Sequence, residues 1–257
     1  MAQSYTNDQA VKRRNKIGGY VSLASLAFLA IGAYFVVTSL FNQNAELVLS
    51  LVPNAEPFRV NYILLAYAMM FLAIGITSFG SRFMTYQRLR PENKLSLALK
   101  GLDKNHRLYS YTLPFPFVLL TPFAVYALLV KPQEGNIIVK GDKWSHGFSL
   151  MRLVRFFAIE PLGDPVRELS EQKDKLTKWL ATELPNVTVP VDGYVVFLDP
   201  NARVALDNPT VAPILLNQDP DALKNALRRD KRTNMPAGIF KQVADLFARH
   251  ATGEEDE

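Results

Sequence analysis

An unbroken run of 25 uncharged residues, Ile17–Phe41 (IGGYVSLASLAFLAIGAYFVVTSLF), sets the first limit on how this chain folds. A helix needs about 20 apolar residues to cross the roughly 30 Å of hydrocarbon in a bilayer. The run is too long for the apolar part of a signal peptide, and no small-x-small cleavage site leads into a polar mature start. We therefore predict a retained transmembrane helix over residues 17–41, preceded by a cytoplasmic segment of residues 1–16.

A second uncharged run, Asn61–Gly80 (NYILLAYAMMFLAIGITSFG), has 20 residues, which is just enough for another crossing. We predict a second transmembrane helix over residues 61–80 and an external loop over residues 42–60. Both runs contain small side chains, which either let two helices pack closely or merely tolerate lipid. These are Gly18, Gly19, Ser22, Ser25, Gly32 and Ala33 in the first run, and Ala66, Ala68, Ala73 and Gly75 in the second.

Basic residues flank the outer ends of the two runs, whereas the loop between them carries only Arg59 beside Glu46 and Glu56. By the positive-inside rule, both termini face the cytoplasm, and we expect a multi-pass protein of a bacterial cytoplasmic (inner) membrane. The flanking residues are expected to contact the headgroups of an anionic lipid bilayer, although clustered Lys and Arg also suit the phosphates of nucleic acid. They are Lys12, Arg13, Arg14 and Lys16 before the first run and Arg82, Arg88, Arg90 and Lys94 after the second.

The chain from Ser81 onward has the composition of a solvated domain. It holds 24 of the 29 basic residues and 21 of the 24 acidic residues. Helix and strand patterns alternate along it, which indicates an α/β domain with a mixed sheet. We divide this part into a basic juxtamembrane linker (81–94), the α/β domain (95–232), a C-terminal helix (233–252) and an acidic tail (253–257).

Local signals place the elements of this domain. Asp164 is a suitable N-cap and Pro165 suits the first helical position, so a long amphipathic helix is expected to follow. The predicted helices are Pro91–Gly101, Val166–Leu184, Asp219–Arg229 and Pro236–His250, and strands are expected at Asn136–Val139 and at the end of Val187–Leu198.

The stretch Tyr111–Lys131 (YTLPFPFVLLTPFAVYALLVK) carries no charge before its last residue, so a third crossing must be weighed. Its prolines Pro114, Pro116 and Pro122 would remove backbone hydrogen bonds that lipid cannot replace. Strands that are covered on both faces also need uncharged, β-branched and aromatic residues. We predict two buried strands that meet at Thr121-Pro122.

Four segments of the domain carry a family resemblance: LALKGLDKNHRLYSYTLP, PFAVYALLVKPQEGNIIVKGDKW, GDPVRELSEQKDKLTKWL and GYVVFLDPNARVALDNPTVAPIL. In order and spacing they resemble the nuclease-related domain (NERD), which looks like a branch of the restriction-endonuclease-like fold. The resemblance covers about Leu95–Arg229 and implies that fold for the α/β domain. Domains of this family are frequently fused to membrane segments.

The resemblance implies a site where two carboxylates hold Mg²⁺ and a lysine stabilises charge during phosphodiester cleavage. In this sequence, Leu129 and Lys131 occupy the Glu and Lys positions of the Glu-x-Lys motif, and the position of the Asp falls near Pro116. No Asp or Glu lies between Asp103 and Glu134. We therefore expect a degenerate, catalytically inactive member with a vestigial Lys131 and no metal or cofactor.

An alternative is a rearranged active site built from Glu134, Asp142, Asp164 and Glu168. The absence of Cys excludes thiolate metal sites, and the three histidines lack the spacing of zinc ligands. The expected function is that of a scaffold or accessory subunit of a membrane-associated complex, with a protein partner or a second copy bound through the hairpin or the domain. The alternatives are nucleic-acid binding without cleavage and, less favoured, a Mg²⁺-dependent nuclease with displaced ligands.

Overall fold

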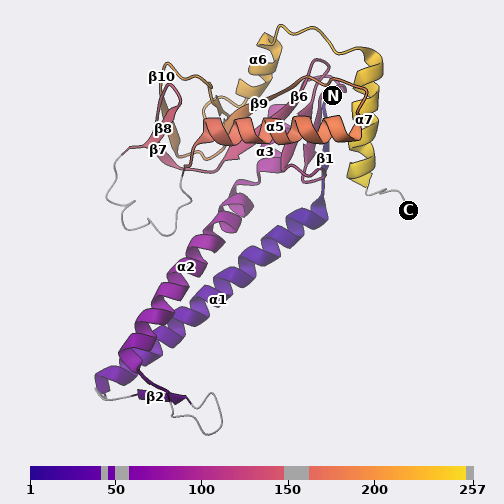
Figure 1. Cartoon of the computed structure of the whole chain (residues 1–257). Coiled ribbons are helices and arrows are strands. Elements are labelled where there is room, and N and C mark those ends of the chain that lie inside the picture. The colour runs from indigo at the N-terminus through magenta and orange to yellow at the C-terminus, as the bar shows by residue number, and fades with distance from the viewer. Residues whose placement is uncertain (42–45, 50–57, 148–161, 253–257) are drawn as a thin grey trace. The chain divides into compact units, whose positions relative to one another are not determined.

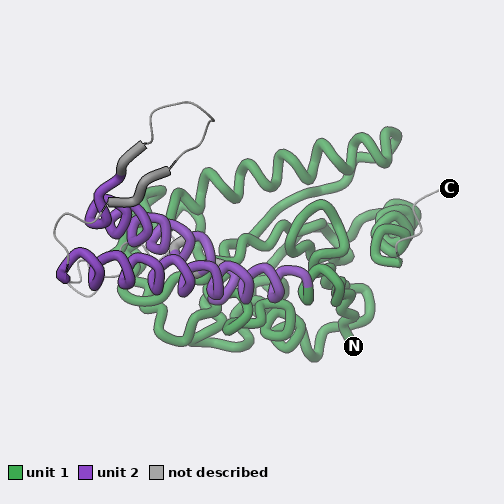
Figure 2. Tube along the Cα trace, turned by 90° about the horizontal axis from the view of Figure 1, so that it is seen from below, with its two compact units in different colours: residues 1–12, 86–148, 161–257 green, residues 13–85, 149–160 purple. Residues whose placement is uncertain are grey.

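Figure 1 shows the computed structural model, which describes residues 1–41, 46–49, 58–147 and 162–252. The side chains of residues 46–49, 58, 59, 78, 81 and 82 lie outside this description. Two compact units divide the chain (Figure 2). Among the described residues, the first unit contains 1–12, 86–147 and 162–252, and the second contains 13–41, 46–49 and 58–85.

A mixed six-stranded sheet forms the centre of the first unit. β1 lies at one edge, parallel to β4, and β4, β5 and β6 run antiparallel to one another in turn. β6, β9 and β11 are parallel, which confirms the α/β domain with a mixed sheet. In spatial order the strands are β1 (Gln3–Thr6), β4 (Arg107–Ser110), β5 (Phe117–Leu120), β6 (Val125–Lys131), β9 (Val191–Phe197) and β11 (Ile214–Leu215).

The uncharged stretch Tyr111–Lys131 contributes strands β5 and β6, as predicted. All seven residues of β6 are buried. Its side chains alternate between two cores, because Tyr126 and Leu128 pack on one face of the sheet and Val125 and Ala127 on the other. A strand that is covered on both faces needs apolar side chains throughout, which explains why this stretch resembles a membrane span.

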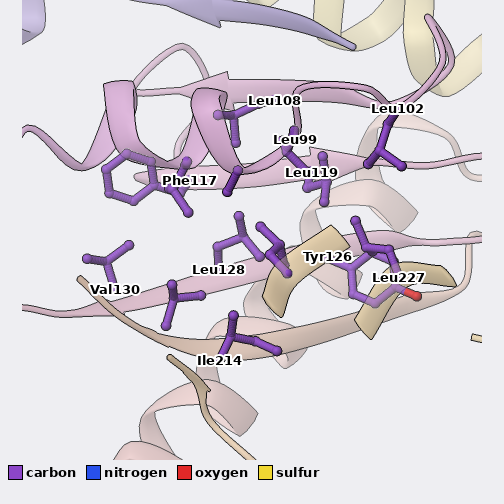
Figure 3. Close-up of a cluster of buried hydrophobic side chains, with 14 of the residues drawn as sticks. Leu99, Leu102, Leu108, Phe117, Leu119, Tyr126, Leu128, Val130, Ile214 and Leu227 are labelled. Atoms are coloured by element: carbon purple, nitrogen blue, oxygen red, sulfur yellow. The ribbon is translucent and has the colours of Figure 1, made fainter. Parts of the chain in front are cut away.

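Helices α3 (Pro91–Ala98) and α6 (Ala222–Arg229) cover the first face of the sheet. Leu99, just after α3, and Leu227 of α6 belong to one buried cluster with Leu119 of β5 (Figure 3). Burial of each such side chain stabilises the fold by about 1.5–3 kcal/mol relative to exposure.

Helices α5 (Pro165–Glu183) and α7 (Ala237–Thr252) cover the second face. Leu176 of α5 and Phe247 of α7 are fully buried in the same cluster. As predicted, Asp164 caps α5, where its carboxylate accepts a hydrogen bond from the Arg167 backbone N–H at 3.1 Å. Because α7 and β1 complete this unit, the unit extends beyond the predicted α/β range 95–232 at both ends.

A smaller three-stranded sheet adjoins this core. Its central strand is β7 (Gly135–Lys140), which pairs in parallel with β10 (Ala202–Asp207) and antiparallel with β8 (Lys143–His146). Trp144 of β8 stacks on Phe197 of β9 with ring centroids 6.0 Å apart. The strand predicted at Asn136–Val139 is therefore confirmed as β7.

The second unit is built from two long helices, α1 (Asp8–Phe41) and α2 (Tyr62–Leu89), which extend beyond it. Between them, β2 (Glu46–Leu49) pairs antiparallel with β3 (Phe58–Asn61). This pair lies in the predicted external loop 42–60, except that β3 ends one residue beyond it. Among the described residues, α1 alone is long and apolar enough to cross a membrane, and the apolar part identified in α2, Tyr62–Thr77, is shorter.

Helix extends beyond the two predicted membrane spans. α1 begins at Asp8 and contains the predicted span 17–41; the Asn7 carboxamide oxygen accepts a hydrogen bond from the Ala10 backbone N–H at 2.9 Å and so caps the helix. The predicted linker 81–94 is largely helical, since α2 continues to Leu89 and α3 begins at Pro91. The acidic tail 253–257 lies outside the described residues.

Candidate functional site

The carboxyl ends of the parallel strands β6 and β9 bring Lys131 of the predicted site close to a buried carboxylate that the sequence analysis did not identify. β6 ends at Lys131, which lies opposite Phe197, the last residue of β9. The fully buried Asp199 follows two residues later. In α/β sheets, ligands bind outside the carboxyl ends of parallel strands, so this edge is where a reaction would be expected.

The ammonium of Lys131 is engaged by groups of the chain itself. Its Nζ donates hydrogen bonds to Glu168 Oε2 at 2.6 Å and to the Leu162 carbonyl oxygen at 2.9 Å, and the residue is only 5% exposed. Glu168 lies in the first turn of α5, where the helix dipole favours a carboxylate. Lys131 therefore connects the end of β6 to the start of α5.

Gly163 makes room for this ion pair. Its φ of +68° lies in the left-handed region, which favours glycine. A Cβ atom added at Gly163 would overlap Glu168 Oε1 and would lie 3.8 Å from Lys131 Nζ. Both the backbone conformation and the space thus require glycine next to the Lys131–Glu168 pair.

Asp199 is engaged in the same way. Its Oδ2 accepts a hydrogen bond from Arg88 Nη2 at 2.5 Å, and its Oδ1 accepts one from the Asn201 backbone N–H at 2.9 Å. Lys94 Nζ donates to the neighbouring Leu198 carbonyl oxygen at 2.9 Å. Arg88 and Lys94, which were predicted to contact lipid or phosphate, therefore bind groups of the α/β unit.

The other predicted lipid-contact residues are distributed over both units. Arg90 is exposed and joins α2 to α3 with a φ of 46°. The side chain of Arg82 lies outside the described residues. On α1, Lys12, Arg13 and Lys16 are exposed, whereas Arg14 is partly buried.

The positions that the family resemblance assigns to metal ligands do not fit a magnesium ion. Leu129 is packed in an apolar cluster with Leu169, and Pro116 precedes β5. Neither side chain offers an oxygen donor, which a hard cation requires. The described residues contain no group of three or more His, Cys, Asp or Glu that could hold a metal ion.

The carboxylates of the alternative, rearranged site have separate contacts. Asp164 caps α5, and Glu168 pairs with Lys131. Glu134 Oε2 lies 4.0 Å from Arg88 Nη2, and Asp142 lies in the turn between β7 and β8. Asp164 and Glu168 therefore have structural contacts within the chain.

The Lys131–Glu168 pair leads to a stability prediction. Glu168→Gln leaves the buried ammonium of Lys131 without its charged partner and is expected to lower the free energy of unfolding by about 1–3 kcal/mol. Partial exposure of Glu168 keeps the loss below the roughly 3–5 kcal/mol expected for a fully buried pair. Urea unfolding of the full chain in detergent, followed by tryptophan fluorescence, measures the loss.

Glu171→Gln is the matched control for this measurement. Glu171 forms an exposed ion pair with Arg167 at 2.8 Å on the same helix. Pairs of this kind contribute about 0–1 kcal/mol. Equal losses in the two variants would show that the Lys131–Glu168 pair does not stabilise the domain.

A second polar network lies at the opposite ends of the same strands, and sequence analysis did not predict it. The Tyr126 hydroxyl donates to Asp230, and Arg232 Nη2 contacts Asp230 Oδ2 at 2.7 Å and Asp192 Oδ2 at 2.8 Å. Burial raises the pKa of Asp230, but hydrogen bonds from Arg232 and Tyr126 outweigh burial and hold that pKa below its usual value. The network connects the segment after α6 to the sheet and has a structural role.

In the second unit, small side chains form the contact between α1 and α2. They recur at every seventh position, which keeps them on one face of each helix. Ser25 Oγ donates to the Ala73 carbonyl oxygen at 3.1 Å and also contacts the Thr77 hydroxyl. The contact residues, all buried, are Gly18, Ser25 and Gly32 on α1 and Ala66, Ala73 and Gly80 on α2.

This contact decides between the two interpretations of the small residues. Close packing is confirmed for Gly18, Ser25, Gly32, Ala66 and Ala73, and Gly80 adds to them. The remaining small residues are exposed in the described structure: Gly19, Ser22, Ala33, Ala68 and Gly75.

Comparisons of this chain with models of protein families, with curated proteins and with solved structures found no match.

Proposed function

We propose that this chain is a scaffold or accessory subunit that a two-helix hairpin anchors in the cytoplasmic membrane. Its α/β domain, which resembles the nuclease-related domain, binds a protein partner and does not cleave nucleic acid. The observation that carries the two-helix arrangement is the pairing of β1 with β4 in one sheet.

That pairing supports an even number of membrane crossings. Residues before α1 and residues after α2 belong to the same sheet, so both ends of the intervening chain lie on one side of any membrane. A crossing by α1 therefore requires a return crossing. The uncharged run Asn61–Gly80, which forms most of α2, has 20 residues, about 30 Å of helix, and in this proposal it supplies the return crossing.

The surface of the two helices supports the same proposal. Only 11% of the most apolar part of α1 is buried, and large side chains such as Leu23, Leu26 and Phe71 are exposed. In water, an apolar surface of this extent promotes aggregation. In a bilayer it faces hydrocarbon, and the basic residues at the outer helix ends favour the cytoplasm for the α/β domain.

The contacts of Lys131 support a role without catalysis. In the cleavage chemistry implied by the resemblance, the lysine must face the reacting phosphate. Here the ammonium is buried and is shared between Glu168 and the Leu162 carbonyl oxygen. Its role in the proposal is to stabilise the fold.

Two measurements on the full chain test the proposal. After extraction in mild detergent, we expect a partner to copurify in stoichiometric amount, and mass spectrometry identifies it. With Mg²⁺ or Mn²⁺, we expect no cleavage of DNA or RNA. Cleavage that is lost in Lys131→Ala would overturn the inactive assignment, and salt-sensitive binding of nucleic acid without a protein partner would overturn the scaffold assignment.

A further inference from the structure

An apolar groove lies between α1 and α2 within the second unit. Its volume is about 490 Å³. Its lining comes from three residues of α1, namely Tyr20, Val21 and Ala24, and three of α2, namely Gly75, Ile76 and Phe79. The groove borders the small-residue contact, because Val21 lines the groove and also packs against Gly80.

The groove is lined by large aromatic side chains and by small residues. The aromatic side chains of Tyr20 and Phe79 are 70% and 55% exposed, respectively. At Gly75, an added Cβ would have no atom within 4 Å, so the missing side chain leaves open space. Glycine inside a helix costs about 1 kcal/mol relative to alanine, so nothing in local helix stability favours this opening.

Two exposed basic residues lie on the same side of α1 as the groove. Lys16 precedes Tyr20 by four residues and Arg13 precedes it by seven, which places all three along one face of the helix. At 1.5 Å per residue, the two basic residues lie about 6 and 10 Å from Tyr20 along the helix axis. The sequence from Gln9 to Phe41 contains no acidic residue that would neutralise them.

This spacing matches the layers of a bilayer. The headgroup region extends roughly 5–8 Å beyond the hydrocarbon on each side. If Tyr20 lies at the hydrocarbon boundary, where tyrosine is enriched, then Lys16 lies at headgroup depth. The backbone of Arg13 lies just beyond that layer, and its long side chain can reach back to the headgroup. A phospholipid with one acyl chain in the groove would bring its phosphate to these two side chains.

We propose that the hairpin binds one anionic phospholipid, with an acyl chain in the Tyr20–Phe79 groove and the headgroup at Lys16 and Arg13. The proposal rests on the membrane anchoring proposed above. A symmetric second copy fits the groove less well, because a two-fold axis along the membrane normal would place like charges of both copies at the same depth. The negative charge of an anionic headgroup instead attracts the positive charges of Lys16 and Arg13.

Native mass spectrometry of the full chain in detergent tests the site, with phosphatidylglycerol and phosphatidylcholine as competing probes. We expect one bound lipid and a preference of about 25-fold for phosphatidylglycerol, roughly fivefold for each of the two basic residues. Gly75→Leu fills the groove and is expected to lower the occupancy by both lipids at least fivefold. The double variant Arg13→Gln/Lys16→Gln is expected to abolish the preference while phosphatidylcholine still binds.

Two variants serve as controls. Gly19→Leu adds the same side chain at an exposed glycine of α1 that does not line the groove, and Lys241→Gln removes an exposed charge from α7. Both are expected to bind lipid like the unaltered chain. Unchanged binding of phosphatidylglycerol to the Gly75→Leu variant would overturn the site. The site would also be overturned if the unaltered chain formed a dimer without bound lipid and Gly75→Leu dissociated that dimer.

Flotation with phosphatidylcholine vesicles separates this inference from the proposed function. All variants are expected to float, since the apolar helices are intact. A chain that floats but shows no preference for phosphatidylglycerol contradicts the lipid site alone. A chain that does not float contradicts the membrane anchoring and the lipid site together.

Discussion

Gly193→Val is expected to lower the free energy of unfolding of the α/β unit by about 3 kcal/mol or more. A Cβ at Gly193 would lie 2.6 Å from the Ala127 carbonyl oxygen and 2.7 Å from Leu169 Cδ1. The first contact is with the backbone of the neighbouring strand β6, which cannot move without breaking sheet hydrogen bonds. Overpacking of a buried site typically costs about 1–3 kcal/mol, and valine adds two more methyl groups.

The sign of this effect is informative, because β-propensity alone predicts that valine stabilises a strand. Urea unfolding of the full chain in detergent measures it through tryptophan fluorescence, since both tryptophans, Trp144 and Trp179, lie in this unit. Gly238→Ala is the control, because a Cβ there meets no atom within 4 Å. A Gly193→Val chain as stable as this control would contradict the packing of β6, β9 and α5.

Gly80→Ile is expected to separate α1 from α2. A Cβ at Gly80 would lie 2.6 Å from Val21 Cγ1 and 3.4 Å from Val21 Cβ. Valine has little freedom to rotate within a helix, so the helices themselves must move apart. An overpacking cost of about 1.4 kcal/mol or more corresponds to at least a tenfold loss of the closely packed hairpin.

Disulfide formation measures this separation, since the native chain has no cysteine. The side chains of Ser25 and Thr77 touch, so the double variant Ser25→Cys/Thr77→Cys should crosslink α1 to α2 when oxidised. Adding Gly80→Ile is expected to lower the yield about tenfold, whereas Gly19→Ile, at a position with open space, should leave it unchanged. Equal yields would mean that the helices do not pack through these small residues.

Much of the fold follows from local patterns. Asp164 and Pro165 mark the start of α5, and the uncharged stretch up to Lys131 gives the buried strands β5 and β6. Strand β1 was not predicted, because its four residues QSYT show no pattern of their own. It forms because β4 offers an edge for pairing and because the Tyr5 ring stacks on the Tyr109 ring, with ring centroids 5.0 Å apart.

In the candidate site, too, local sequence patterns predict some features, whereas contacts between residues far apart in the sequence determine others. The replacement of carboxylates by Leu129 and Pro116 is evident in the sequence, as is the position of Lys131 at the end of an apolar run. That Lys131 pairs with Glu168 depends on how α5 packs against the sheet, which no local pattern encodes. The same holds for the contact of Arg88 with Asp199, since the two residues are far apart in the sequence.

Cysteine labelling in spheroplasts tests the two-span anchoring most directly. Asn54→Cys lies between the two apolar runs, and Glu255→Cys lies near the C-terminus. With a membrane-impermeant maleimide, we predict that Cys at position 54 is labelled in intact spheroplasts and that Cys at position 255 is labelled only after permeabilisation. Labelling of position 255 from outside, or protection of position 54 until permeabilisation, would contradict a hairpin that holds both termini in the cytoplasm.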